Sequence, residues 1–142
     1  MKKKIVTINL LTIAVERFII KERCQTTDNK EANMSYVLKD QDAILEDLGK
    51  GVSRKILAYD ENMMMVKVFF EEKAVGSVHS HPHEQVTYVV EGSFEFSIGD
   101  ELKKVSKGDS LYFSPNELHG TTCIEKGILL DVFTPKRADF LT

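Results

Sequence analysis

From residue 54 onward, short apolar runs alternate with turn residues along the chain. The runs are rich in β-branched and aromatic residues, which is typical of β-strands, and none has the apolar spacing of a good helix. Many short strands at this spacing predict an antiparallel β-sandwich or barrel. The predicted strands cover residues 54–59, 63–70, 77–81, 84–91, 93–98, 101–106, 110–113, 117–124 and 128–134.

Turn residues define the ends of these runs. Gly99 and Asp100 stand between two of them, which is a strong signal for a two-residue hairpin. Ahead of the strands, residues 40–48 contain several apolar positions and are followed by Gly49 and Gly51. This segment predicts one short helix that ends at the glycines.

Three of the four histidines lie at alternate positions, His79, His81 and His83, and are followed by Gln85. Alternate residues of an extended strand project from one face, so these side chains would point together. The fourth histidine, His119, lies 34 residues beyond Gln85 and could be brought opposite by a second strand. A lone histidine is usually a surface or hydrogen-bonded residue, but this clustering predicts a metal pocket of three imidazoles and one amide oxygen.

Size and charge limit the classes of function. The 142 residues fit one domain with a real core, and the 42% hydrophobic and 29% charged content is that of an ordinary soluble globular protein. The net charge of −3 argues against a nucleic-acid partner, and no apolar run is long enough to span a membrane. Cys24 and Cys123 form no disulfide framework and are interpreted as reduced thiols of a cytosolic protein.

Residues 1–33 differ from the rest of the chain. They carry seven Lys or Arg against four Asp or Glu, whereas the remainder carries twelve against eighteen. A basic start and an apolar stretch resemble a signal peptide, but no small-x-small cleavage site follows. The alternatives are a short extra strand or helix, or sequence upstream of a true start at Met34, which we favour. The predicted domains are an N-terminal extension, 1–33, and a β domain, 34–142.

Two motifs carry a family resemblance. In the first, a Gly is followed by His-x-His, then by Gln after three residues and by Gly after six more; the residues are Gly76, His79, His81, Gln85 and Gly92. The spacing from Gly76 to His79 is shorter than usual. This pattern resembles the first motif of the cupins, which are small β-barrels of the jelly-roll type.

The second motif places Gly108 and Asp109 before a short apolar run, then Pro115 and His119. It resembles the second cupin motif, although Asn116 stands where a Gly is common. Together the motifs cover roughly residues 76–123, and the resemblance implies an all-β, single-domain cupin barrel.

A narrower resemblance comes from residues 79–85 together with the end of the chain, residues 129–141. These segments are similar to pectin-degradation cupins that linearise unsaturated monouronates. Such proteins open the ring of 4,5-unsaturated galacturonate or mannuronate to a linear 5-keto-4-deoxyuronate. The likeness runs from about Met34 to Leu141.

The resemblance implies one bound divalent metal ion, with nickel, zinc, manganese and iron all left open. Its ligands would be His79, His81, Gln85 and His119. Gln85 stands where cupins usually carry Glu, so the ligands include no obvious anion and the ion would keep its charge as a Lewis acid.

Four further residues would complete the site. Asp131 would act as general base or acid, and Arg137 would bind the substrate carboxylate through its fork of N–H groups. Phe133 would form a wall of the pocket, and His83 would lie at its rim as a substrate-binding residue. The alternative is an Asp131–Arg137 structural ion pair, with Phe133 in the core.

Other functions stay open at this point. Another cupin enzyme, either a dioxygenase or a sugar isomerase, is one alternative, and a non-enzymatic sugar-binding cupin is another. The expected partner is a small sugar acid, without nucleic acid or membrane. By family analogy the chain would form a homodimer, and we expect it in the cytoplasm, with export through residues 1–33 as the lesser alternative.

Overall fold

The computed structural model describes residues 37–142, so the expectations for residues 1–33 and for Cys24 lie outside the described part. Strands dominate it, with one short 3-10 turn at each end. The elements are η1 (Asp40–Asp42), β1 (Leu45–Gly49), β2 (Val52–Tyr59), β3 (Met64–Phe70), β4 (Val75–His79), β5 (Glu84–Ile98), β6 (Glu101–Ser106), β7 (Ser110–Phe113), β8 (His119–Thr134) and η2 (Ala138–Phe140).

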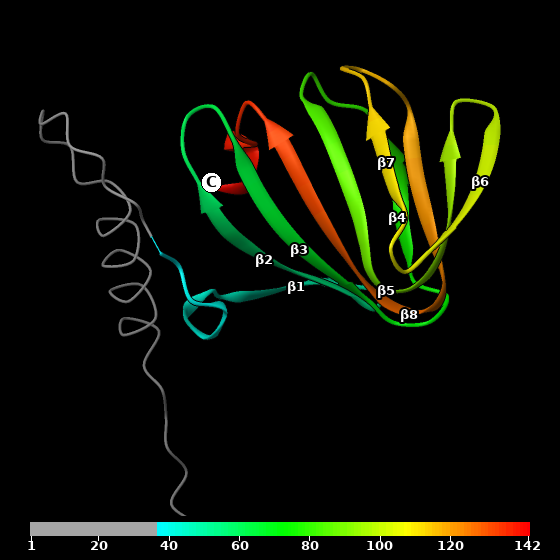
Figure 1. Ribbon diagram of the computed structural model, residues 1–142, viewed down its shortest axis with the longest axis horizontal. Helices are drawn as coiled ribbons and strands as arrows, with labels where there is room; N and C mark the ends of the chain where they lie inside the picture. The colour runs from blue at the N-terminus through cyan, green and yellow to red at the C-terminus, as the bar shows by residue number, and fades with distance from the viewer. Residues whose placement is uncertain (1–36) are drawn as a thin grey trace, which may run out of the picture. The chain divides into compact units, whose positions relative to one another are not determined.

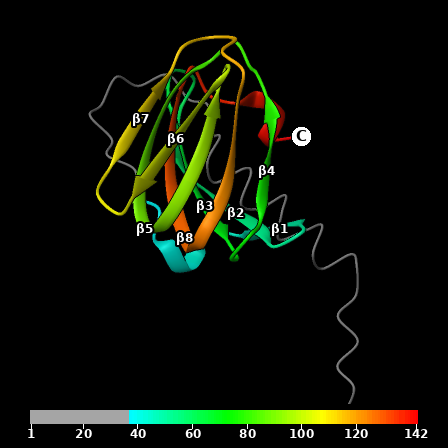
Figure 2. The same cartoon turned by 90° about the vertical axis from the view of Figure 1, so that its right-hand side faces the viewer.

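The strands form one antiparallel sheet that curls into a jelly-roll barrel, as predicted (Figure 1). The hydrogen-bonded order is β1-β2-β3-β8-β5-β6, and β4 and β7 pair off this path with β8 and β5. Figure 2 shows β4 on one side of β8, with β5 and β6 on the other. The two long central strands therefore pair with four of the others: β8 with β3 and β4, and β5 with β6 and β7.

Both central strands are longer than predicted. The runs 84–91 and 93–98 form the single strand β5, and the runs 117–124 and 128–134 merge into β8, with shifts of register near Gly92. At that bend the backbones nearly touch: a Cβ at Gly92 would lie 2.5 Å from the Glu125 carbonyl oxygen, and one at Gly127 would lie 2.3 Å from that of Glu91. The glycines therefore permit a bend where the sequence suggested an end.

The short helix predicted over residues 40–48 was wrong. Only η1 is helical there, and two of the apolar residues that suggested a helix, Leu45 and Leu48, belong to β1, where they are about half exposed. Gly49, Lys50 and Gly51 all have positive φ and make the turn that returns the chain into β2. Pairing with β2 gives this backbone its hydrogen bonds, and no apolar helix face is buried.

The barrel interior divides into an aromatic core and a polar end. Along β5, the buried residues alternate from Gln85 through Thr87 to Val89, so one strand face passes from polar to apolar. The apolar core contains Phe70, Ala74, Val89, Phe94, Phe96, Phe113, Cys123 and Leu129. Within residues 37–142, no helix has the length and apolar character needed to span a membrane.

Candidate metal centre

The histidines meet where β4 and β8 lie side by side. His79 ends β4, His119 begins β8, and the two are direct cross-strand partners. The strand expected over 77–81 ends two residues early, so His81 and His83 lie in the connection to β5 and strand periodicity does not place them. Instead, the Asn116 N–H donates to the His81 carbonyl oxygen at 2.7 Å and fixes this connection against the β7–β8 turn.

Each imidazole of the cluster is oriented by a backbone carbonyl two residues away. His79 Nδ1 lies 2.8 Å from Ser77 O, and His119 Nδ1 lies 2.8 Å from the carbonyl oxygen of Glu117. A carbonyl only accepts hydrogen bonds, so Nδ1 carries the proton and Nε2 keeps a free lone pair. The ligand atoms of His79, His81 and His119 all lie within 4.8 Å of one another, so the three residues could hold one metal ion.

Two observations, one at His119 and one at His81, show that these residues fit a cation. Within the described part of the chain, His119 Nε2 is buried and has no hydrogen-bond partner. His81 Nε2 lies 2.9 Å from Gln85 Oε1, while His81 Nδ1 lies 3.2 Å from the carbonyl oxygen of His83. A neutral imidazole has one N–H, so one of these two contacts joins two acceptors. Two ligands about 2.1 Å from one ion are about 3 Å apart when they meet it at a right angle, which is close to the 2.9 Å between His81 Nε2 and Gln85 Oε1.

Protonation of the imidazoles near neutral pH does not supply the missing hydrogen-bond donors. Burial lowers the pKa of His81 to about 4, although its contact with Gln85 acts in the opposite direction. Burial likewise lowers the pKa of His119. Both imidazoles are therefore neutral at pH 7, which is the form that binds metals.

Gln85 connects the histidines to a partly buried acid. Its Nε2 donates to Thr87 Oγ1 at 2.9 Å and to Asp131 Oδ1 at 3.3 Å, which turns the amide oxygen toward His81. Thr87 Oγ1 donates to Asp131 Oδ1 at 2.6 Å. Burial raises the pKa of Asp131 to about 6, while the hydrogen bonds from Thr87 and Gln85 lower it. Asp131 is thus a carboxyl group that can hold or release a proton close to neutral pH.

Thr87 was not singled out from the sequence. It lies two residues after Gln85 on the same buried strand face, and its side chain is fully buried. A polar residue at period two from a proposed ligand is the signal that could have found it. Phe113 was also missed as a neighbour of the site: its ring stacks on His119 with centroids 4.4 Å apart.

Phe133 and Arg137 lie beside the histidines. The Phe133 ring meets His81 edge-on, with centroids 5.5 Å apart, and it also belongs to a small core with Met64 and Val66. Arg137 is 8% exposed, and its ion-pair partner is Asp139, not Asp131 as in the structural alternative considered from the sequence. Asp131 and Arg137 are therefore each held by other residues.

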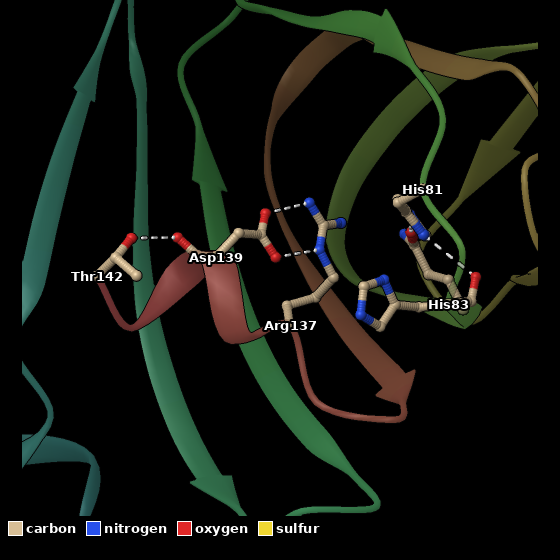
Figure 3. A network of polar contacts seen from close by, with 6 residues as sticks. His81, His83, Arg137, Asp139 and Thr142 are labelled. Carbon is tan, nitrogen blue, oxygen red and sulfur yellow. Dashed lines mark hydrogen bonds and ion pairs between the residues drawn. The ribbon is translucent and has the colours of Figure 1, made fainter.

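His83 lies outside the three-histidine cluster. Its ring centroid is 5.5 Å from that of His81, and its buried Nδ1 has no hydrogen-bond partner among residues 37–142. Figure 3 shows the His83 ring between His81 and Arg137. This position is compatible with a substrate contact at the rim of the pocket.

Comparisons with known proteins agree with this geometry. Residues 66–133 match the family described as the cupin domain. The chain is 43% identical over 104 residues to the pectin degradation protein KdgF of Dickeya dadantii (strain 3937), which covers 72% of this chain and 94% of that protein.

Two solved structures are similar over 75% of the chain. One is an RmlC-like cupin from Shewanella frigidimarina NCIMB 400, with 38% identity, a TM-score of 0.72 and 96% of its own chain covered. The other is KdgF from a Halomonas species, with 32% identity, a TM-score of 0.72 and 99% covered.

Proposed function

The chain belongs to the cupin family, in the group of the pectin degradation protein KdgF, and from this premise we propose that it opens the ring of 4,5-unsaturated monouronates. The product would be the linear 5-keto-4-deoxyuronate. The observation that carries the proposal is the placement of Asp131: this partly buried acid, with a pKa near 6, is hydrogen-bonded to Gln85, whose amide oxygen contacts the cluster of neutral imidazoles.

One divalent metal ion would be held by His79, His81, His119 and the Gln85 amide oxygen. Bound by neutral ligands only, the ion would supply Lewis acidity toward the oxygens of the substrate. The hydrogen bonds that Gln85 donates to Thr87 and Asp131 keep the amide oxygen, and not its nitrogen, directed at this position.

Ring opening is an isomerisation that needs one proton to be moved. The proton leaves the anomeric hydroxyl, the bond from C1 to the ring oxygen breaks, and the resulting enolate takes a proton at C4 as it becomes the 5-ketone. Asp131 can serve both steps, because a base with a pKa near 6 accepts a proton and returns it close to neutral pH. Its Oδ1 accepts from Thr87 and Gln85, so Oδ2 is the oxygen that would exchange the proton.

Two more residues fit the rest of the substrate. Arg137 supplies a buried positive charge beside the histidines, suited to the uronate carboxylate. Phe133 gives the pocket an apolar wall against His81. The homodimer and the cytoplasmic location stay predictions of the family resemblance.

The test is turnover of unsaturated monouronate by the purified full chain. We expect the ultraviolet absorbance of the ring alkene to fall faster with metal-loaded protein than without protein, and we expect chelation to abolish the acceleration. Asp131→Asn should lose turnover while it retains the metal, as measured by elemental analysis. Asp100→Asn, in an exposed hairpin turn, is the matched control and should retain full activity.

A metal-replete chain that does not accelerate the absorbance loss would refute the ring-opening function. If that protein still bound the monouronate, the sugar-binding alternative would replace it. Turnover retained in Asp131→Asn would limit Asp131 to a structural role.

A further inference from the structure

The C-terminal turn holds Arg137 in a fixed orientation. Arg137 Nε donates to Asp139 Oδ1 at 3.0 Å, and Nη2 donates to Asp139 Oδ2 at 2.8 Å, so the carboxylate binds one whole edge of the guanidinium. Paired N–H···O bonds of this kind fix the plane of the guanidinium as well as its position. The Thr142 hydroxyl donates to the Asp139 carbonyl oxygen and ties the chain end to the same turn.

The same guanidinium also lies over two aromatic rings. Arg137 Cζ lies 4.3 Å from the centroid of the Phe140 ring and 5.3 Å from that of Phe133. Phe140 also contacts a second guanidinium, because Arg54 Cζ lies 4.0 Å from its centroid. Arg54 is itself fixed by Glu46 at 2.8 Å, so η2 is fastened to β1 and β2.

The two hydrogen bonds to Asp139 leave the other N–H groups of the Arg137 guanidinium without a hydrogen-bond partner among the residues that the structure describes. A guanidinium has five N–H donors, and Asp139 uses one on Nε and one on Nη2. The remaining Nη1 and Nη2 donors form a second, end-on fork. In Figure 3 the edge that binds Asp139 faces away from His81, and the third nitrogen lies on the side of His81 and His83.

The charge of Arg137 also reaches the histidine cluster. Burial is the main cause of the lowered pKa values of His81 and His119, and the positive charge of Arg137 adds to it in both cases. The same charge favours the ionised form of Asp131. The geometry agrees, because the Phe133 ring contacts both the Arg137 guanidinium, at 5.3 Å, and the His81 ring, at 5.5 Å, so Arg137 lies one aromatic ring away from the histidine cluster.

We propose that Asp139 and Phe140 are positioning residues that preset Arg137, so that its free end-on fork receives the carboxylate of the substrate. The proposal rests on the proposed function, because it assumes a uronate in the pocket. Neither residue touches the substrate in this scheme. Asp139 binds the edge of the guanidinium that faces away from His81, and the Phe140 ring packs against the guanidinium.

A matched substitution separates positioning from charge. Asp139→Asn removes a negative charge beside Arg137, and charge alone would then make an anionic substrate bind better and lower KM. Loss of the two hydrogen bonds to Asp139 would raise KM instead, because the Arg137 guanidinium would then have to be ordered when the substrate binds. The direction of the change in KM therefore decides between the two causes.

We expect Asp139→Asn to raise KM about tenfold, the equivalent of one lost charge-assisted hydrogen bond, with kcat and metal content little changed. Asp139→Glu should recover part of the loss, since it restores a carboxylate. Glu101→Gln removes the carboxylate of an exposed ion pair with Lys103 on β6 and should leave KM unchanged. A lower or unchanged KM in Asp139→Asn would overturn the proposal.

A readout that does not depend on turnover keeps this test separate from that of the function. In the wild type, the Nε–H proton of Arg137 should give a protected NMR signal, because it is buried and bound to Asp139. The signal should vanish in Asp139→Asn and shift when galacturonate, a non-reacting uronate, is added. Protection without turnover would reject the ring-opening function alone, whereas equal exchange in wild type and variant would reject the positioning role.

Discussion

Thr87 and Asp131 are direct partners across the β5–β8 ladder, and the Thr87 hydroxyl donates to Asp131 Oδ1 at 2.6 Å. This hydrogen bond favours the ionised carboxylate, whereas burial raises the pKa of Asp131 to about 6. The buried hydroxyl therefore adjusts the proton affinity of the group that we propose as the base.

Thr87→Val should move the pH profile of the enzyme. The substitution keeps the shape of the side chain but removes the donor, so the pKa of Asp131 rises further, by about one unit. Since the base must be ionised to accept a proton, the acidic limb of the kcat/KM profile should shift to higher pH. Thr122→Val, at an exposed position of β8, is the control and should leave the profile in place. A shift of the Thr87→Val limb to lower pH would contradict the assigned role.

Metal binding should appear as thermal stabilisation. An ion that binds only the folded chain stabilises it by about 2.7 kcal/mol at 100 times its Kd, so Tm should rise when a divalent metal is added to chelator-treated protein. His81→Ala should lose most of this rise, because its imidazole belongs to the cluster. His83→Ala should keep it, since His83 lies outside the cluster. An equal metal-induced rise in wild type and His81→Ala would place the ion elsewhere.

The general fold was accessible from the sequence because strand alternation and turn chemistry are local signals. The Gly99–Asp100 hairpin between β5 and β6 follows from two residues, and the structure contains it. The bend at Gly92 and Gly127 was not accessible, since it depends on the contact between two strands far apart in the chain. The same holds for residues 45–49, where pairing with β2 overrides a local helix pattern.

The site, like the fold, could be predicted from the sequence only in part. The motif spacing pointed to His79, His81 and His119, and the structure brings them together. The motif spacing did not reveal how His81 is placed, because its position depends on a loop that is hydrogen-bonded to Asn116 and not on strand periodicity. Asp139 was passed over because a surface acid two residues after an arginine is ordinary in sequence. Its importance follows only from the buried orientation of Arg137.

The close approach of β5 and β8 predicts an intolerant glycine. Gly127→Ala would place its Cβ 2.3 Å from the Glu91 carbonyl oxygen and 2.9 Å from the Phe94 ring, so backbone and core must both move. We expect a loss of about 3 kcal/mol in the free energy of unfolding, measured by urea denaturation. Gly99→Ala meets open space and should cost only the roughly 1 kcal/mol of a left-handed alanine. Equal costs at both positions would show that the strands separate easily at the bend.

Asp131→Asn should make the metal-free protein more stable, and only at higher pH. The pKa of Asp131 is raised to about 6 in the folded chain against 3.8 in the unfolded chain, so the unfolded carboxyl ionises first as the pH rises. Above pH 6 this lowers the free energy of unfolding of the wild type by up to about 3 kcal/mol, a loss that the uncharged amide of the variant avoids. In urea denaturation the variant should exceed the wild type at pH 8 and match it near pH 4, while the histidines affect both proteins alike. Asp100→Asn measures the effect of losing an exposed carboxylate. A stability difference that is independent of pH would mean that Asp131 carries no such penalty.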